Sequence, residues 1–145
     1  MFKRLNLMIL MVLFSLNIDA KEYSYEPGEK RANIYAIGNE PIFFCKKGEL
    51  YFARKNKKGY LTVPSGSRID LHGRIFAMSS NAYASTSFSS TAKLSFIPDD
   101  WQDYMMSTDM VGNQCIIDLV KIDKSAPVGL AVLDTIKEAR GCGEK

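Results

Sequence analysis

The sequence predicts a mainly β fold: a small antiparallel sandwich or barrel with one or two short helices. First, 46% of the 145 residues are hydrophobic and 24% are charged, a balance typical of a chain that folds. Second, β-branched and aromatic runs alternate with Gly, Asn and Lys turns about every ten residues. Third, few segments have helical spacing, and these are short. We expect an extended lead-in at 21–31 and a single β-rich domain at 32–145.

The first twenty residues have the pattern of a secretory signal peptide. Lys3 and Arg4 precede an apolar run from Leu5 to Leu16, and the chain then becomes polar before Ala20. An apolar helix of about twelve residues rises about 18 Å, which is too short for a hydrocarbon core of about 30 Å. We therefore expect cleavage after Ala20, a periplasmic or secreted protein, and no stable membrane span.

The domain divides into seven or eight short strand-like segments. Turns that contain Gly, Asn or Lys separate many of them, as in a meander of hairpins. The segment 115–122 is apolar on both faces except at Asp118 and Lys121, which predicts a central strand. The expected strands are 34–37, 42–45, 50–53, 60–63, 69–78, 92–97, 115–122 and 128–133.

Four segments are less regular. Residues 99–113 begin with an Asp cap followed by apolar residues, which predicts a helix of one or two turns. Asp134 is a candidate cap for a short tail helix that ends at Arg140. Residues 79–91 contain six serines and predict a surface loop. Residues 69–78 fit a strand or a hairpin that turns at His72 and Gly73, with a short helix at 74–84 as the alternative.

The three cysteines predict one disulfide in an exported protein. Cys45 and Cys115 both lie in apolar strand-like runs, and Cys142 lies between glycines near the end of the chain. We expect a bridge between Cys45 and Cys115, which would close a loop of about 70 residues. The alternative is a bridge between Cys115 and Cys142 that attaches the tail to a strand.

The sequence contains no pattern for a catalytic, cofactor or metal site. We find no phosphate-binding glycine loop, CxxC pair, HExxH or EF-hand. His72 is the only histidine, and its predicted position at a hairpin tip favours an exposed turn residue. Four Cys and His residues exist in total, and the three cysteines are already candidates for a bridge. We expect no enzyme activity and no cofactor, and the net charge of +3 is too small for nucleic-acid binding.

A cluster of positive charges is the strongest local signal for a partner. It includes Lys46 and Lys47 and the following turn, and clustered charge steers an acidic partner during association. Two aromatic residues are candidate anchors for the same face. The alternative is a solvated loop whose lysines keep a sheet edge from pairing. The predicted partner-binding residues are Arg54, Lys55, Lys57, Lys58, Trp101 and Tyr104.

These features favour an exported, disulfide-bonded, non-catalytic binding protein. We expect a bacterial periplasmic immunity or inhibitor protein that blocks a partner effector or toxin. The first alternative is a glycan-binding B subunit of a secreted toxin with an OB-fold, because the segments 41–45 and 128–130 loosely resemble that family. The second cysteine typical of those subunits is missing. The other alternative is an envelope or pilus subunit, and these readings allow an oligomer.

Overall fold

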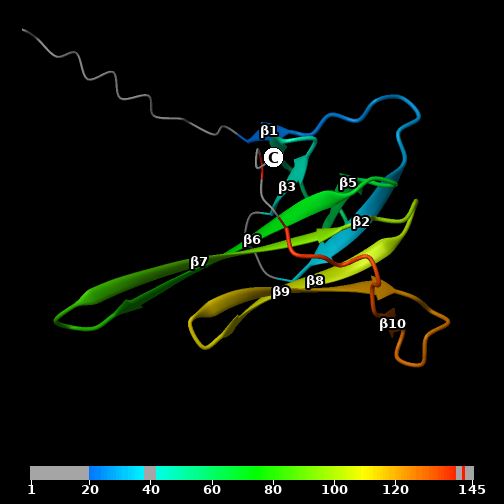
Figure 1. Ribbon diagram of the computed structural model, residues 1–145. Helices are drawn as coiled ribbons and strands as arrows, with labels where there is room; N and C mark the ends of the chain where they lie inside the picture. Colours follow the sequence, from blue (N-terminus) through cyan, green and yellow to red (C-terminus); the bar gives the residue numbers. More distant parts are fainter. Residues whose placement is uncertain (1–19, 38–41, 140–141, 143–145) are drawn as a thin grey trace, which may run out of the picture.

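The computed structural model describes residues 20–37, 42–139 and 142, and their strands form two five-stranded sheets (Figure 1). Sheet A has the strand order β1-β4-β3-β6-β7, and sheet B has the order β10-β9-β8-β2-β5. The strands are β1 (Lys21–Glu22), β2 (Arg31–Ala36), β3 (Phe43–Lys46), β4 (Glu49–Phe52), β5 (Tyr60–Pro64), β6 (Ile69–Ser80), β7 (Ser85–Phe96), β8 (Asp103–Val111), β9 (Gln114–Ile122) and β10 (Leu130–Ala131).

The prediction of a mainly β, sandwich-like fold is confirmed, but both sheets are mixed rather than purely antiparallel. β1 runs parallel to β4, and β2 runs parallel to β8. The remaining strand pairs are antiparallel. Within the described ranges, no helix is long and apolar enough to cross a bilayer. The predicted signal peptide falls almost wholly on residues 1–19, which lie outside the described residues.

The hydrophobic core lies between the two sheets because alternate strand residues point inward. Ile34 and Tyr104 from sheet B and Phe44, Leu71 and Phe96 from sheet A are all fully buried. The Phe96 and Tyr104 rings meet edge to face, with centroids 5.3 Å apart. Each sheet therefore has one inner face in the core and one outer face, and the outer faces remain for other contacts.

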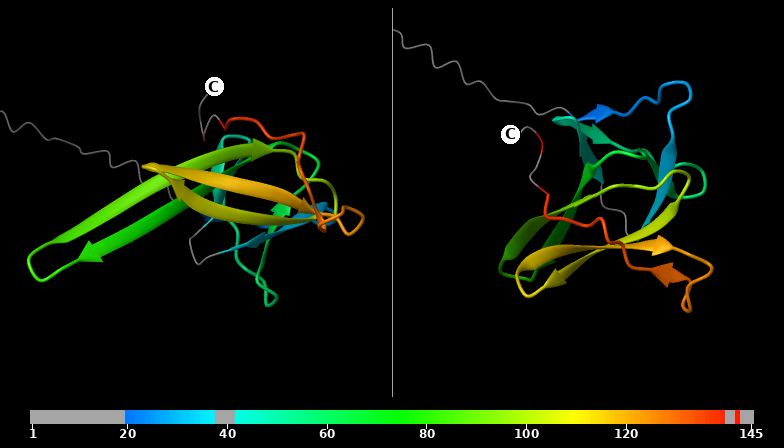
Figure 2. Two further views of the ribbon diagram at one scale, coloured as in Figure 1. Left: turned by 90° about the horizontal axis from the view of Figure 1, so that it is seen from below. Right: turned by 45° about the vertical axis from the view of Figure 1, so that its right-hand side comes forward.

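The two longest hairpins cross closely at Gly73 in β6. A Cβ atom added at this position would lie 3.0 Å from Thr108 Oγ1 and 3.2 Å from Ile117 Cδ1. Thr108 and Ile117 are paired residues of β8 and β9, so any larger residue at position 73 would push these two side chains aside where β6 passes over them. Beyond this crossing the β6–β7 hairpin projects from the body (Figure 1 and the left view of Figure 2).

The predicted helices are wrong, because both segments follow other geometry. Residues 103–111 form β8, whose alternation buries Tyr104 and Met106 and leaves Met105 half-buried on the outer side. Trp101 has a φ of 60°, which a right-handed helix excludes. The described part of the tail contains no helix, and Lys137 pairs with Ser95 of β7 through two backbone hydrogen bonds.

The predicted serine-rich loop at 79–91 is also wrong. Ser79 and Ser80 end β6, and β7 begins at Ser85, so the turn contains only four residues. Asn81 organises this turn, because its Oδ1 accepts the backbone N–H groups of Tyr83 and Ala84 at 3.0 and 2.8 Å. Twelve residue pairs in register extend the ribbon to this turn, so cross-strand pairing outweighs the weak strand preference of serine.

Candidate binding surface

The outer face of sheet B carries a row of apolar side chains, one of them exposed and three half-buried. Strand register places Tyr60 beside Tyr35, Tyr35 beside Met105, and Met105 beside Val120. We call these four residues the outer row. Tyr35 is 44% exposed, and the other three are half-buried. The outer face of a sandwich is usually polar, so this row is a candidate contact surface.

The two tyrosines of the outer row are packed against each other. Their ring centroids lie 5.7 Å apart, and the position of a Cβ on Gly59 would be 3.8 Å from the Tyr35 ring. Ile37, next on the same face of the chain after Tyr35, is 56% exposed. Because neighbouring groups hold the rings, the row offers a preformed apolar area rather than isolated mobile side chains.

A polar pocket lies next to the outer row. Asn33 Nδ2 donates to Asp103 Oδ1 at 2.9 Å, and Thr62 Oγ1 donates to Asn33 Oδ1 at 3.4 Å. The pocket has a volume of about 530 Å³, and it connects this pair to the basic turn. Its lining residues are Asn33, Asn56, Lys57, Lys58, Tyr60 and Asp103.

The basic turn contributes to this surface only in part. Lys57 and Lys58 are exposed and line the pocket, whereas Arg54 points to Glu22 of β1, with Nε 2.7 Å from Oε1. Lys55 forms an isolated backbone bridge to Leu61. Asn56 fixes the turn, because its Oδ1 accepts the backbone N–H groups of Lys58 and Tyr60. Two of the four predicted basic residues therefore lie beside the outer row.

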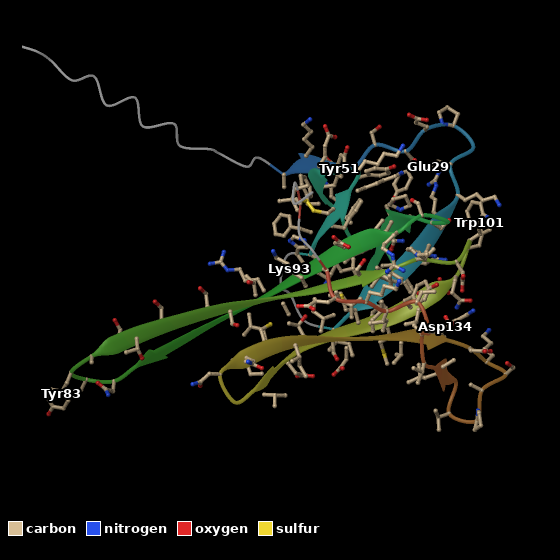
Figure 3. All side chains as sticks on the ribbon, in the orientation of Figure 1. Glu29, Tyr51, Tyr83, Lys93, Trp101 and Asp134 are labelled. Atoms are coloured by element: carbon tan, nitrogen blue, oxygen red, sulfur yellow. A yellow bond between two sulfur atoms is a disulfide. The ribbon has the colours of Figure 1, made fainter. Side chains whose placement is uncertain are left out.

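The two predicted aromatic anchors do not join the basic turn. Trp101 is 69% exposed, and its backbone N–H donates to the Arg31 carbonyl at the start of β2. The basic turn leads into Tyr60 of β5, which pairs with Tyr35 near the opposite end of β2. Figure 3 shows Trp101 at the edge of the molecule. Tyr104 is fully buried, and its hydroxyl accepts the Asp99 N–H at 2.8 Å. The prediction that Tyr104 is a surface anchor is wrong because the inward positions of β8 fill the core.

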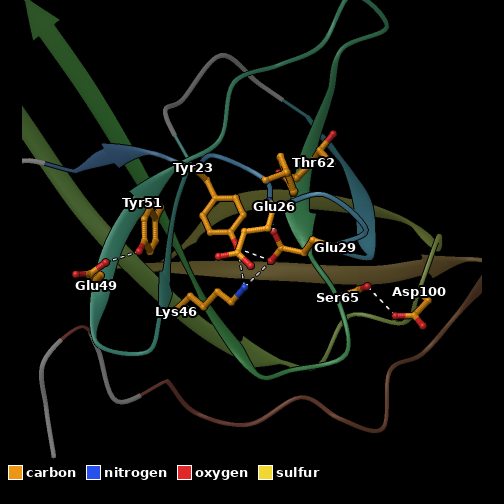
Figure 4. A network of polar contacts seen from close by, with 10 residues as sticks. Tyr23, Glu26, Glu29, Lys46, Glu49, Tyr51, Thr62, Ser65 and Asp100 are labelled. Atoms are coloured by element: carbon orange, nitrogen blue, oxygen red, sulfur yellow. Dashed lines mark hydrogen bonds and ion pairs between the residues drawn. The ribbon is translucent and has the colours of Figure 1, made fainter.

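Lys46 is not part of a basic surface either. Its Nζ lies 2.7 Å from Glu29 Oε1 and 2.6 Å from the Tyr23 hydroxyl, which also donates to Glu29 (Figure 4). Burial alone would raise the pKa of Glu29, but the hydrogen bonds from Lys46 and Tyr23 outweigh it and lower that pKa. This half-buried network joins the lead-in to β3.

The disulfide joins Cys45 to Cys142, with Cα atoms 5.5 Å apart, so both predicted pairings are wrong. Cys115 is free and buried in β9, against the backbone of Ile75, and burial raises its thiol pKa. Sequence placement identified Cys45 correctly but not its partner, because the return of the tail across sheet A depends on tertiary contacts. A disulfide fits an oxidising compartment.

His72 lies within β6 rather than at a hairpin tip, paired with Phe43 on one side and Lys93 on the other. Its Nε2 is buried and has no hydrogen-bond partner among the described residues. Burial, then the positive charge of Lys93, lowers its pKa, so the ring stays neutral near pH 7. The ligand atoms of Cys45, His72 and Cys142 all lie within 4.8 Å of one another.

Comparison of the chain with protein-family models, curated proteins and solved structures gave no match. The residues of the outer row therefore stand on geometry alone. Sequence reasoning missed Tyr35, Met105 and Val120 because each lies in a run with apolar residues on both faces. A run that is apolar on both faces predicts a strand, but it does not show whether the outer face of that strand is buried or exposed to solvent.

Proposed function

We propose that this chain is an exported binding protein of the periplasmic immunity or inhibitor type, which blocks a partner effector through the outer face of sheet B. The observation that carries the proposal is the outer row, four aromatic and aliphatic side chains in register across four strands. Neighbouring strands are about 4.8 Å apart, so the row spans about 14 Å, the scale of an interface centre.

The composition of the row supports a protein partner. Tyrosine and methionine are enriched at the centres of protein interfaces, where aromatic anchors supply much of the binding energy. Hydrogen-bonding groups border the row, as the polar rim of an interface requires. On one side are Asn33 and Asp103 in the pocket, and on another is Asp118 of β9, which is exposed.

Charge supports an acidic contact on the partner. Lys57 and Lys58 are exposed at the pocket, and positive charge at the rim of an interface increases the association rate more than the affinity. The partner we propose therefore presents an apolar patch with carboxylates at one border. Increasing the salt concentration should slow association with such a partner.

Two features support export. The disulfide between Cys45 and Cys142 fits an oxidising compartment, and the pattern of residues 1–20 is that of a signal peptide. A periplasmic destination is where an immunity protein or a hydrolase inhibitor would meet an incoming effector.

The test combines partner capture with paired tyrosine variants. The tagged protein is co-expressed with the products of neighbouring genes and recovered from the periplasm, and captured proteins are identified by mass spectrometry. We expect Tyr35→Ala to weaken binding of the captured partner at least about 30-fold. Tyr83→Ala is the matched control, because Tyr83 is 98% exposed at the distant hairpin tip (Figure 3).

Two results would overturn this proposal. One is the recovery of no protein partner even with the neighbouring gene products present. The other is an equal loss of affinity in Tyr35→Ala and Tyr83→Ala, which would move the contact away from the outer row.

An envelope or pilus subunit is the second candidate, and the projecting half of the β6–β7 ribbon favours it. β3 pairs only with residues 70–72 of β6, so within the described chain the two strands beyond this point pair only with each other. Such open edges can accept a strand from another chain. This candidate predicts concentration-dependent polymers in analytical ultracentrifugation, and deletion of residues 77–88 should abolish them. A monomer at all concentrations would exclude it.

A further inference from the structure

Three metal-ligating side chains meet on the outer face of sheet A, away from the surface proposed for the partner. Cys45 lies in β3, His72 in the adjacent β6, and Cys142 in the tail that returns over them. Their ligand atoms all lie within 4.8 Å of one another. The chain thus gathers both of its disulfide-bonded sulfurs and its only histidine at one place.

His72 supplies a second observation at the same place. Its Nε2 is buried without a hydrogen-bond partner in the described structure. A buried polar nitrogen without a partner is destabilising, so such an atom calls for an explanation, and a role as a metal ligand supplies one.

The donor set determines the class of ion. Two thiolates and one imidazole are soft to borderline ligands that favour Zn²⁺ over Mg²⁺ or Ca²⁺. Ligand atoms of a tetrahedral zinc site are about 3.5 Å apart, given zinc–ligand bonds of about 2.0 to 2.3 Å. The three ligands start within 4.8 Å of one another, so small side-chain rotations would bring them to this spacing.

We propose that Cys45, His72 and Cys142 bind one Zn²⁺ ion when both cysteines are thiols, so that the disulfide and the metal complex are alternative states of one site. Two Sγ–Zn bonds and one N–Zn bond form, and each thiol releases one proton, with no electron transfer. A water molecule completes the tetrahedron. The disulfide form enters this state by accepting two electrons and two protons from a dithiol reductant, which becomes a disulfide.

This site has a consequence for the tail. Either the disulfide or the ion holds Cys142 against β3, so the tail stays attached in both redox states. The sequence predicted no metal site because the chain has only four Cys and His residues. Three of these four lie together here, which a count along the sequence does not reveal.

Cobalt titration tests the proposal. The protein is reduced with a phosphine under anaerobic conditions, and Co²⁺ is added as a spectroscopic substitute for Zn²⁺. We expect one equivalent to bind with thiolate-to-cobalt charge-transfer and tetrahedral ligand-field bands, and Zn²⁺ to displace it. His72→Ala should weaken Co²⁺ binding at least about 10-fold, and Cys142→Ser at least about 100-fold.

Cys115→Ser is the matched control, because Cys115 is the free cysteine in the other sheet and should not contribute. His72→Ala retains both bridging cysteines, so the thermal unfolding of its disulfide form shows whether it folds. Failure of the reduced protein to bind Co²⁺ would overturn the proposal, and so would equal affinities of folded His72→Ala and Cys115→Ser. Neither result bears on the outer row, which lies on sheet B.

Discussion

The outer faces of the two sheets differ in what covers them. On sheet A, Cys45 points outward and is nevertheless only 6% exposed, because the tail and Cys142 lie against it. On sheet B, Tyr35 also points outward and is 44% exposed. The path of the tail, rather than a property of the sheets themselves, therefore determines that Cys45 is covered while Tyr35 stays exposed.

The lead-in also attaches to sheet A, but at its edge and against core-facing rings of its inner side. β1 pairs with β4 at the edge of this sheet, and the Tyr23 ring packs against Phe44 and Tyr51, with centroids 5.4 and 5.0 Å away. The network of Tyr23, Glu29 and Lys46 then fixes the lead-in (Figure 4). Both described ends of the chain therefore attach to sheet A, and the strongest tests of the comparison remove these attachments.

Removal of the tail attachment should have the largest effect. The disulfide spans 97 residues, and a loop of this size contributes about 4.7 kcal/mol in the chain-entropy model. We expect Cys142→Ser to lower the free energy of unfolding by about that amount in urea titrations. Reduction of the native protein in metal-free buffer should have the same effect, and Cys115→Ser should retain the response to reductant. An unfolding midpoint that does not change on reduction would contradict the covalent attachment.

Loosening of the lead-in should have an intermediate, pH-dependent effect. Since the pKa of Glu29 is lowered from 4.5 in the folded state, its stabilising contribution is present above that value and is lost as pH falls through the folded pKa. We expect Glu29→Gln to lower the free energy of unfolding by about 1–2 kcal/mol at pH 7, and the difference from the native protein to shrink below about pH 4.5.

Glu26→Gln is the charge-matched control for this experiment, because Glu26 is exposed in the same turn. It should change stability much less than Glu29→Gln at every pH. Parallel pH profiles for Glu29→Gln and the native protein would show that the network with Lys46 does not stabilise the fold.

A change on the bare face should have the smallest effect on stability. Tyr35→Ser removes an exposed ring and its contact with Tyr60, so we expect a loss of about 0.5–1 kcal/mol in urea titrations. Tyr104→Ala, at an inward position of the neighbouring strand, should cost about 3–5 kcal/mol. Comparable losses would mean that the outer row supports the fold rather than a partner.

The sequence predicted the fold class well because β-branched and aromatic runs with frequent turns exclude most other architectures. It failed at residues 99–113, where an Asp cap outweighed the alternation of Tyr104 and Met106. It failed again at 79–91, where serine content suggested a loop. In both places pairing with a neighbouring strand decides the structure, and the local sequence pattern does not show which strand will pair with it.

The candidate sites were less accessible to sequence reasoning. Lys57 and Lys58 were identified from charge, whereas Tyr35 and Met105 gain their meaning only when register places them in one row. Trp101 and Tyr104 are close in the sequence but have opposite environments. Local composition reports which residue types are present, and it does not report which face of a sheet another segment will cover.

Alternation and cysteine number are local properties, so the amino-acid sequence predicts a mainly β domain with one disulfide among three cysteines. The pairing of Cys142 with Cys45, the position of His72 beside them and the exposure of Tyr35 on sheet B follow from the three-dimensional arrangement. These outcomes depend on contacts between residues up to 97 positions apart in the sequence. Bringing such residues together costs loop-closure entropy, which the packing of the folded core offsets.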